Sequence, residues 1–275
     1  MKKIGLTLGG GGARGFAHIL FLEALDEMNI RPSVISGTSI GAIIGGFYAS
    51  GLSGSEIREI AEGIRFRDIN KMLDINLFGD ALFKGKGVEE FLNRYIKIKT
   101  FEELDIPLNI VATDYWKNSQ VVVNSGPLIP AIRASMSLPG IFEPLHYKNR
   151  ILIDGGAVNP LPYDIIRDKC DILIAIDVTG DMEAKNMDKP PNMFESVMGT
   201  FQIMQNSILL NKRRITDIDL YVKPEMHGTG ILEFHKYKEI MKYADREIDG
   251  FKSRLNDLLK GNVLSFFERF KLPGK

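Results

Sequence analysis

The chain has one cysteine in 275 residues, no excess of either charge and no long unbroken apolar run. A lone Cys170 cannot form an intrachain disulfide, which favours a reducing compartment, and its place at the start of an apolar run favours a buried thiol. Lys and Arg count 35, as do Asp and Glu, so an uncompensated basic surface for nucleic acid is not expected. The most apolar stretch, residues 40–49, is much shorter than the roughly 20 residues of a membrane span. We therefore expect a soluble, cytoplasmic protein that does not bind nucleic acid.

The sequence also lacks the patterns of metal and nucleotide sites. It contains neither H-E-x-x-H nor C-x-x-C, and none of its four histidines adjoins a motif-like acid. A P-loop needs Lys and then Ser or Thr after its last glycine, whereas Phe16 follows Gly15. A dinucleotide fingerprint needs an acid about 20 residues further on, and residues 36–39 hold none. We expect no metal and no cofactor.

Short apolar runs alternate with segments of helical periodicity, which predicts an α/β fold with a mostly parallel central sheet. The predicted strands are 4–8, 32–36, 107–113, 120–124, 151–153, 172–178 and 220–222. The predicted helices are 15–29, 40–49, one from residue 55, 126–134, 194–210 and about 240–258. Without a linker or repeat, residues 1–275 are predicted to form a single domain, with motifs in 4–210 and C-terminal helices in 233–272.

Two segments leave their interpretation open. Residues 67–87 mix large apolar side chains with glycines, which fits either a lid over an apolar cleft or a covered connection. In the tail, Val263, Phe266, Phe267 and Phe270 share one helical face beside basic residues. That face fits peripheral contact with a membrane, and docking on the protein's own core or in a homodimer is the favoured alternative.

The segment Gly37-Thr38-Ser39-Ile40-Gly41 has the pattern of a nucleophile elbow, G-x-S-x-G. A tight turn between a strand and a helix lifts such a serine hydroxyl clear of the sheet, and glycines on both sides avoid side-chain collisions. The following helix directs its N-terminal N–H groups toward developing negative charge. Ser39 is therefore the candidate nucleophile, although the pattern by itself also fits an ordinary turn.

Two further glycine-bearing segments supply the remaining parts of an acyl-transfer site. Gly10, Gly11 and Gly12 expose successive backbone N–H groups and predict an oxyanion hole. Arg14 is interpreted as a residue that braces this loop, with a contribution to positive potential as the alternative. Asp154 ends an apolar strand before two glycines, where apolar surroundings raise a carboxyl pKa and favour a general base. An Asp-Gly turn is the competing interpretation.

In order along the chain, residues 8–15, 37–41, 134–144 and 154–156 resemble the motifs of the patatin-like phospholipase family, of the compact bacterial type. The resemblance covers about residues 4–210 and implies a three-layer α/β/α fold with lipid acyl hydrolysis by a Ser-Asp dyad. It places Ser39 as nucleophile and Asp154 as base. Plant patatins carry an acid where this chain has Gly9 and often Ala where it has Gly156, so substrate preference does not transfer.

The combined expectation is a serine acyl hydrolase that cleaves lipid or lysophospholipid esters through an acyl-serine. Two alternatives keep the same fold. One is a regulatory adaptor that binds lipid with little turnover, and the other is an acyltransferase that uses an alcohol acceptor in place of water.

Overall fold

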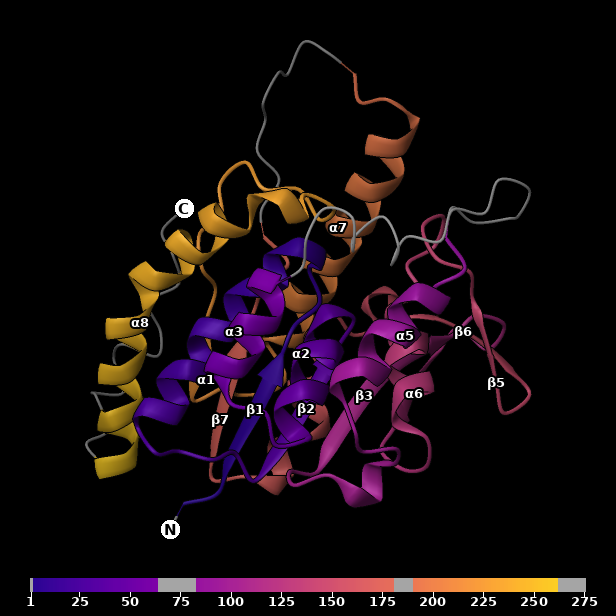
Figure 1. Ribbon diagram of the computed structural model, residues 1–275. Coiled ribbons are helices and arrows are strands. Elements are labelled where there is room, and N and C mark those ends of the chain that lie inside the picture. The colour runs from indigo at the N-terminus through magenta and orange to yellow at the C-terminus, as the bar shows by residue number, and fades with distance from the viewer. Residues whose placement is uncertain (1, 64–82, 181–189, 262–275) are drawn as a thin grey trace.

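The computed structural model describes residues 2–63, 83–180 and 190–261 (Figure 1). Most of the predicted lid segment 67–87, most of the loop predicted at 180–191 and the apolar tail face from Val263 to Phe270 lie outside these residues. None of the described helices combines the length and apolar composition that crossing a bilayer requires.

An eight-stranded mixed sheet forms the centre of the fold (Figure 1). Its order is β5 (Leu145–Tyr147), β6 (Arg150–Asp154), β3 (Leu108–Asp114), β2 (Val34–Thr38), β1 (Ile4–Leu8), β7 (Ile172–Ile176) and β8 (Leu220–Val222), with β4 (Ser119–Val123) also paired to β3. The five strands β3, β2, β1, β7 and β8 pair in parallel. Strands β4, β5 and β6 are antiparallel to their neighbours.

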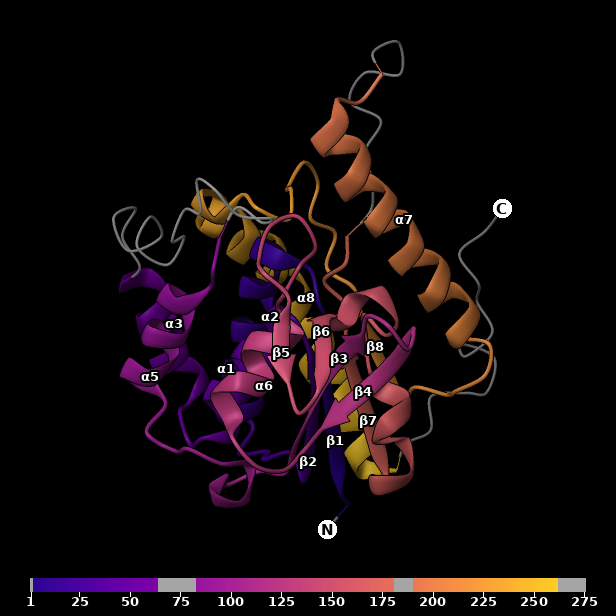
Figure 2. The ribbon, with the colours of Figure 1, turned by 90° about the vertical axis from the view of Figure 1, so that its right-hand side faces the viewer.

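Helices cover both faces of this sheet, as predicted. The thicker layer consists of α1 (Ala17–Glu27), α2 (Ile40–Ala49), α3 (Gly54–Gly63), α5 (Lys86–Tyr95), α6 (Leu128–Ser135) and α8 (Tyr237–Lys260). On the opposite side lies α7 (Met193–Lys212), together with short 3-10 turns (Figure 2).

Strand β7 shows how alternating side chains build the two cores. Ile172, Ile174 and Ile176 belong to the main cluster with α1, α2 and α8. Leu173 and Ala175 point to the other face and join the smaller cluster that includes Leu209 of α7. The α/β fold class predicted from alternating segments is therefore confirmed.

Among the described α-helices and strands, two were not predicted. The helix α5 buries Val88, Phe91 and Leu92, which have helical spacing but follow Gly85 and Gly87 closely. The strand β5 has only three residues, too few for a pattern. At the C-terminal end, α8 stops at Lys260, before a glycine in the left-handed region.

Candidate active site

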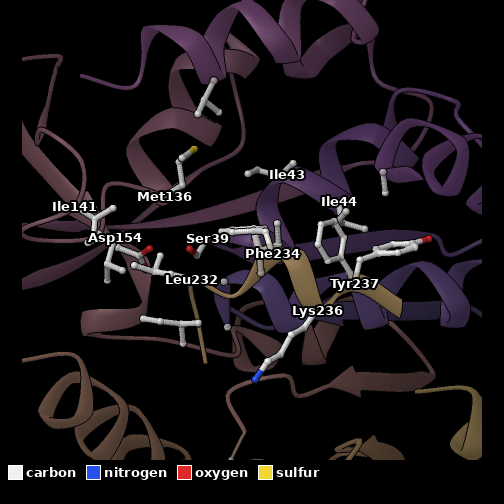
Figure 3. A pocket seen from close by; sticks show the side chains of 18 of the residues that line it. Ser39, Ile43, Ile44, Met136, Ile141, Asp154, Leu232, Phe234, Lys236 and Tyr237 are labelled. Atoms are coloured by element: carbon white, nitrogen blue, oxygen red, sulfur yellow. The ribbon is translucent and has the colours of Figure 1, made fainter. Parts of the chain in front are cut away.

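Strands β2 and β6 bring Ser39 and Asp154 together because both pair with the same edge of β3, from opposite directions. Thr38, the last residue of β2, lies opposite Val111, and Asp154, the last residue of the antiparallel β6, lies opposite Ala112. Because β4 occupies the other edge of β3, the carboxyl ends of β2 and β6 must abut. Two residues that are 115 positions apart in the sequence therefore face each other (Figure 3).

The backbone of Ser39 is held in a sharp turn between β2 and α2. Its φ of 55° and ψ of −121° are unusual for a residue with a side chain, and strain of this kind is concentrated at functional sites. The turn packs closely against the end of β1. A Cβ on Gly41 would therefore collide with the carbonyl oxygen of Leu8. The helix α2 begins directly at Ile40, so its positive end adjoins the hydroxyl.

Ser135 holds the turn from the other side. The Ser39 N–H donates to Ser135 Oγ at 2.8 Å, and Ser135 Oγ donates to the carbonyl oxygen of Val111 at 2.6 Å. The Ser135 side chain is fully buried. Sequence reasoning placed this serine in a family motif without assigning it a role.

Asp154 is buried, with 2% of its surface exposed. Burial raises the pKa of its carboxyl from the ordinary 3.8 to about 6, and hydrogen bonds from the Ser39 side chain and the Gly156 N–H act in the opposite direction. The Gly156 N–H donates to Asp154 Oδ1 at 2.7 Å, while Figure 3 shows the carboxylate turned toward the Ser39 hydroxyl. A carboxylate with this pKa is mostly ionised at neutral pH and is a stronger base than an exposed aspartate.

The glycine loop differs from the prediction at one residue. The N–H of Gly10 donates to the carbonyl oxygen of Pro160 at 2.8 Å, so it is not a free oxyanion donor. Gly11 and Gly12 line the same cavity as Ser39, and within the described residues their N–H groups donate to no protein acceptor. Of the three glycines predicted to form an oxyanion hole, Gly11 and Gly12 are therefore the two whose N–H groups are available.

Gly12 is required by conformation as well as by space. Its φ is +59°, and a Cβ there would collide with the carbonyl oxygen of Ile231. The next N–H, that of Ala13, donates to this carbonyl at 2.8 Å. The loop therefore lies directly against the segment that precedes α8.

Arg14 lies behind the loop with 4% of its surface exposed. Its Nε donates to the carbonyl oxygen of Thr229 at 2.8 Å, and Nη1 donates to that of Thr179. Nη2 lies 3.5 Å from Oε1 of Gln202 on α7. These contacts join three distant segments to the glycine loop, which is the arrangement of a bracing residue.

No histidine hydrogen-bonds Ser39 or Asp154 in the described part of the chain. His18 is fully buried, and its Nε2 lies 2.9 Å from the carbonyl oxygen of Gly9. Burial lowers the pKa of His18 to about 4, so the ring is neutral at physiological pH. His235 lines the cavity. Among the described residues there is also no group of three His, Cys, Asp or Glu side chains placed to hold a metal ion.

Ser39 and Asp154 open into an apolar cavity of about 840 Å³, within the range of small-molecule sites. Its walls come from α2, α3, α5, α7 and the segment before α8. The apolar lining includes Ile40, Ile43, Ile44, Phe47, Ile57, Ile60, Val88, Phe91, Met136, Leu138, Ile141, Phe142, Met198, Phe201, Ile231, Leu232 and Phe234. Figure 3 shows Ile43, Met136, Ile141, Leu232 and Phe234 around the Ser39 hydroxyl.

Residues 6–167 match the family of patatin-like phospholipases. The chain is 34% identical over 192 residues to an uncharacterised NTE family protein of Mycobacterium tuberculosis, covering 70% of this chain and 53% of that protein. It is 37% identical over 184 residues to patatin-like phospholipase domain-containing protein 7 of Rattus norvegicus, covering 64% of this chain and 14% of the relative. The chain therefore spans about half the length of its mycobacterial relatives and less of the animal ones.

A solved structure shares the fold. The crystal structure of VipD from Legionella pneumophila superimposes with a TM-score of 0.58 at 15% identity, covering 91% of this chain and 67% of that chain. On the family match, the chain belongs to the patatin-like phospholipase family.

Proposed function

We propose that the protein is a lipid acyl hydrolase that cleaves carboxylic esters of lipids or lysophospholipids with Ser39 as nucleophile and Asp154 as base. The observation that carries the proposal is the contact between this hydroxyl and a buried carboxylate at the wall of a large apolar cavity. Such a cavity suits a fatty acyl chain, because burying each CH₂ contributes about 0.8 kcal/mol.

In the first half-reaction, Asp154 accepts the proton of Ser39 as its oxygen attacks the ester carbonyl. Negative charge develops on the carbonyl oxygen, where the N–H groups of Gly11 and Gly12 are the available donors. One such donor is worth about 3 kcal/mol of transition-state stabilisation. The tetrahedral intermediate collapses to acyl-Ser39, and the proton passes from Asp154 to the departing alcohol oxygen.

In the second half-reaction, water takes the place of the alcohol. Asp154 accepts a proton from this water, whose oxygen attacks the acyl carbon. Collapse releases the fatty acid and returns the proton to Ser39 Oγ. The same carboxylate therefore acts as base and then acid in each half-reaction.

A fluorophosphonate probe tests the proposal directly. We expect covalent labelling of the parent protein, none in Ser39→Ala, and labelling at least about 100-fold slower in Asp154→Asn. Release of fatty acid from a lysophospholipid should follow the same order. A folded parent that neither labels nor hydrolyses any ester would reject the enzyme and favour a lipid-binding adaptor.

A further inference from the structure

On the helix α7, two polar side chains are buried while neighbouring apolar side chains are exposed, the reverse of an ordinary surface helix. Gln202 and Gln205 are each only 8% exposed, whereas Ile203 and Met204 between them are 58% and 50% exposed. Burying an amide in place of an apolar side chain is unfavourable unless the amide meets polar partners. Departures of this kind from the usual pattern occur where function requires them.

Both ends of α7 are fixed, so the position of its glutamines is well determined. At the N-terminus, Asn192 and Glu195 form a reciprocal capping box with two hydrogen bonds of 2.9 Å. At the C-terminus, Lys212 Nζ donates to the carbonyl oxygen of Leu161 at 2.8 Å and pairs with Asp164.

The two glutamines differ in their contacts. Gln202 is satisfied by protein, because its Nε2 donates to the carbonyl oxygen of Thr179 at 3.2 Å and its Oε1 faces Arg14. Gln205 lines the cavity together with Ser39 and Asp154. Within the described residues, its amide makes no hydrogen bond to protein.

The amide of Gln205 lies beside the base. A Cβ on Gly156 would overlap Gln205 Nε2 and would lie 3.0 Å from Asp154 Oδ1. The side-chain amide and the carboxylate therefore both border the small space next to the Gly156 Cα. Gly156 leaves the room that the amide fills.

From this geometry, and given the proposed function, we propose that Gln205 forms the acyl-acceptor subsite. Its amide hydrogen-bonds the alcohol oxygen that leaves in the first half-reaction and the water that replaces it in the second. Asp154 must exchange a proton with each of these oxygens in turn, so both come to the space beside the carboxylate. The N–H groups of Gly11 and Gly12 are assigned to the carbonyl oxygen, so they are not available to the alcohol or the water.

The test compares two esters with the same acyl chain, a p-nitrophenyl ester and a monoacylglycerol, in the Gln205→Met protein. Nitrophenolate leaves without being protonated, whereas the glycerol oxygen requires a proton and a hydrogen-bonding partner. We expect kcat/KM to fall at least about tenfold for the monoacylglycerol and less than about threefold for the nitrophenyl ester, from the usual worth of one hydrogen bond. Equal losses for both esters, or no loss, would overturn the proposal.

Gln202→Met is the matched control, since it makes the same change one turn away on the same face. It loosens the contact with Arg14 behind the glycine loop, so both esters should slow by the same factor. Discrimination between the esters in this control as strong as in Gln205→Met would overturn the assignment to Gln205.

Gly156→Ala gives an independent second measurement. The added methyl group displaces the Gln205 amide, so the variant should reproduce the selective loss of Gln205→Met. In a Gln205→Ala background the methyl group no longer meets the amide, so Gly156→Ala should then add no further discrimination between the two esters. Losses of ester discrimination that simply multiply when Gly156→Ala and the Gln205 substitution are combined would contradict the shared space.

Fluorophosphonate labelling separates the two proposals. A labelled protein without ester discrimination rejects only the subsite, and an unlabelled parent rejects the proposed function.

Discussion

Replacing Asp154 by Asn should stabilise the protein at neutral pH while it abolishes turnover. Burial raises the pKa of Asp154 from 3.8 to about 6. The folded state therefore holds a proton between these values that the unfolded state has lost, and stability falls as pH rises through that window. A shift of about 2 units corresponds to about 3 kcal/mol at pH 7 and above. The Asn amide keeps the size and the acceptor for the Gly156 N–H without the buried charge.

The assay is urea unfolding of the parent and of Asp154→Asn at several pH values between 4 and 8. The quantity to follow is the free energy of unfolding of the variant minus that of the parent. We expect this difference to increase by about 2 kcal/mol between pH 4 and pH 7, because the unfolded state has already begun to titrate at pH 4, and to be nearly constant above. In the same window, kcat/KM of the parent should rise with pH as the carboxylate ionises. A stability difference that does not change with pH, or that decreases as pH rises, would refute the reasoning.

Three further substitutions, one of them paired with a control on α8, test other contacts in and around the site. The pKa of His18 is lowered from 6.5 to about 4, so its burial lowers the free energy of unfolding as pH falls through that window. In urea unfolding, His18→Gln should remove about 3 kcal/mol of this pH dependence. Equal pH slopes of the unfolding free energy in the two proteins would contradict this expectation. Ser135→Ala should lower kcat about tenfold and stability by about 1–3 kcal/mol, because the Ser39 N–H loses its buried acceptor, whereas an unchanged kcat would show that the hydroxyl does not position the turn. Gly12 has a φ of +59° and lies against a backbone carbonyl, so Gly12→Ala should slow fluorophosphonate labelling more than about tenfold. The control Gly250→Ala, in open space on α8, should leave labelling unchanged and raise the free energy of unfolding by about 1 kcal/mol. Similar labelling rates for these two variants would be the contrary result.

Local patterns were enough to predict most strands and the motifs at their ends. Strand β1 and helix α2 have the predicted bounds, because the first apolar run lies between Lys3 and Gly9 and the second is followed by Gly51. The raised pKa of Asp154 also has the predicted cause, since the strand before it is apolar and buried.

Features that depend on distant contacts could not be read from the sequence. The N–H of Gly10 is taken by the carbonyl of Pro160, which lies 150 residues away, and nothing near Gly10 indicates this bond. The helix at 194–210 was predicted without its buried face, and in the structure Ile203 is exposed whereas Gln205 is buried and lines the cavity. Which face of a helix packs inward is decided here by a polar site that other segments assemble.

Ser39, Asp154 and the buried His18 beside the glycine loop all reduce the stability of the fold. Ser39 has an unfavourable backbone conformation, Asp154 is ionised in a buried position, and His18 leaves Nδ1 without a partner among the described residues. Each feature is held in place by hydrogen bonds from neighbouring segments, because a strained group relaxes unless its surroundings fix it. Stabilising substitutions should therefore be concentrated within this site and should reduce turnover. If Asp154→Asn proved as active as the parent and no more stable, the buried charge would not have the functional meaning assigned to it.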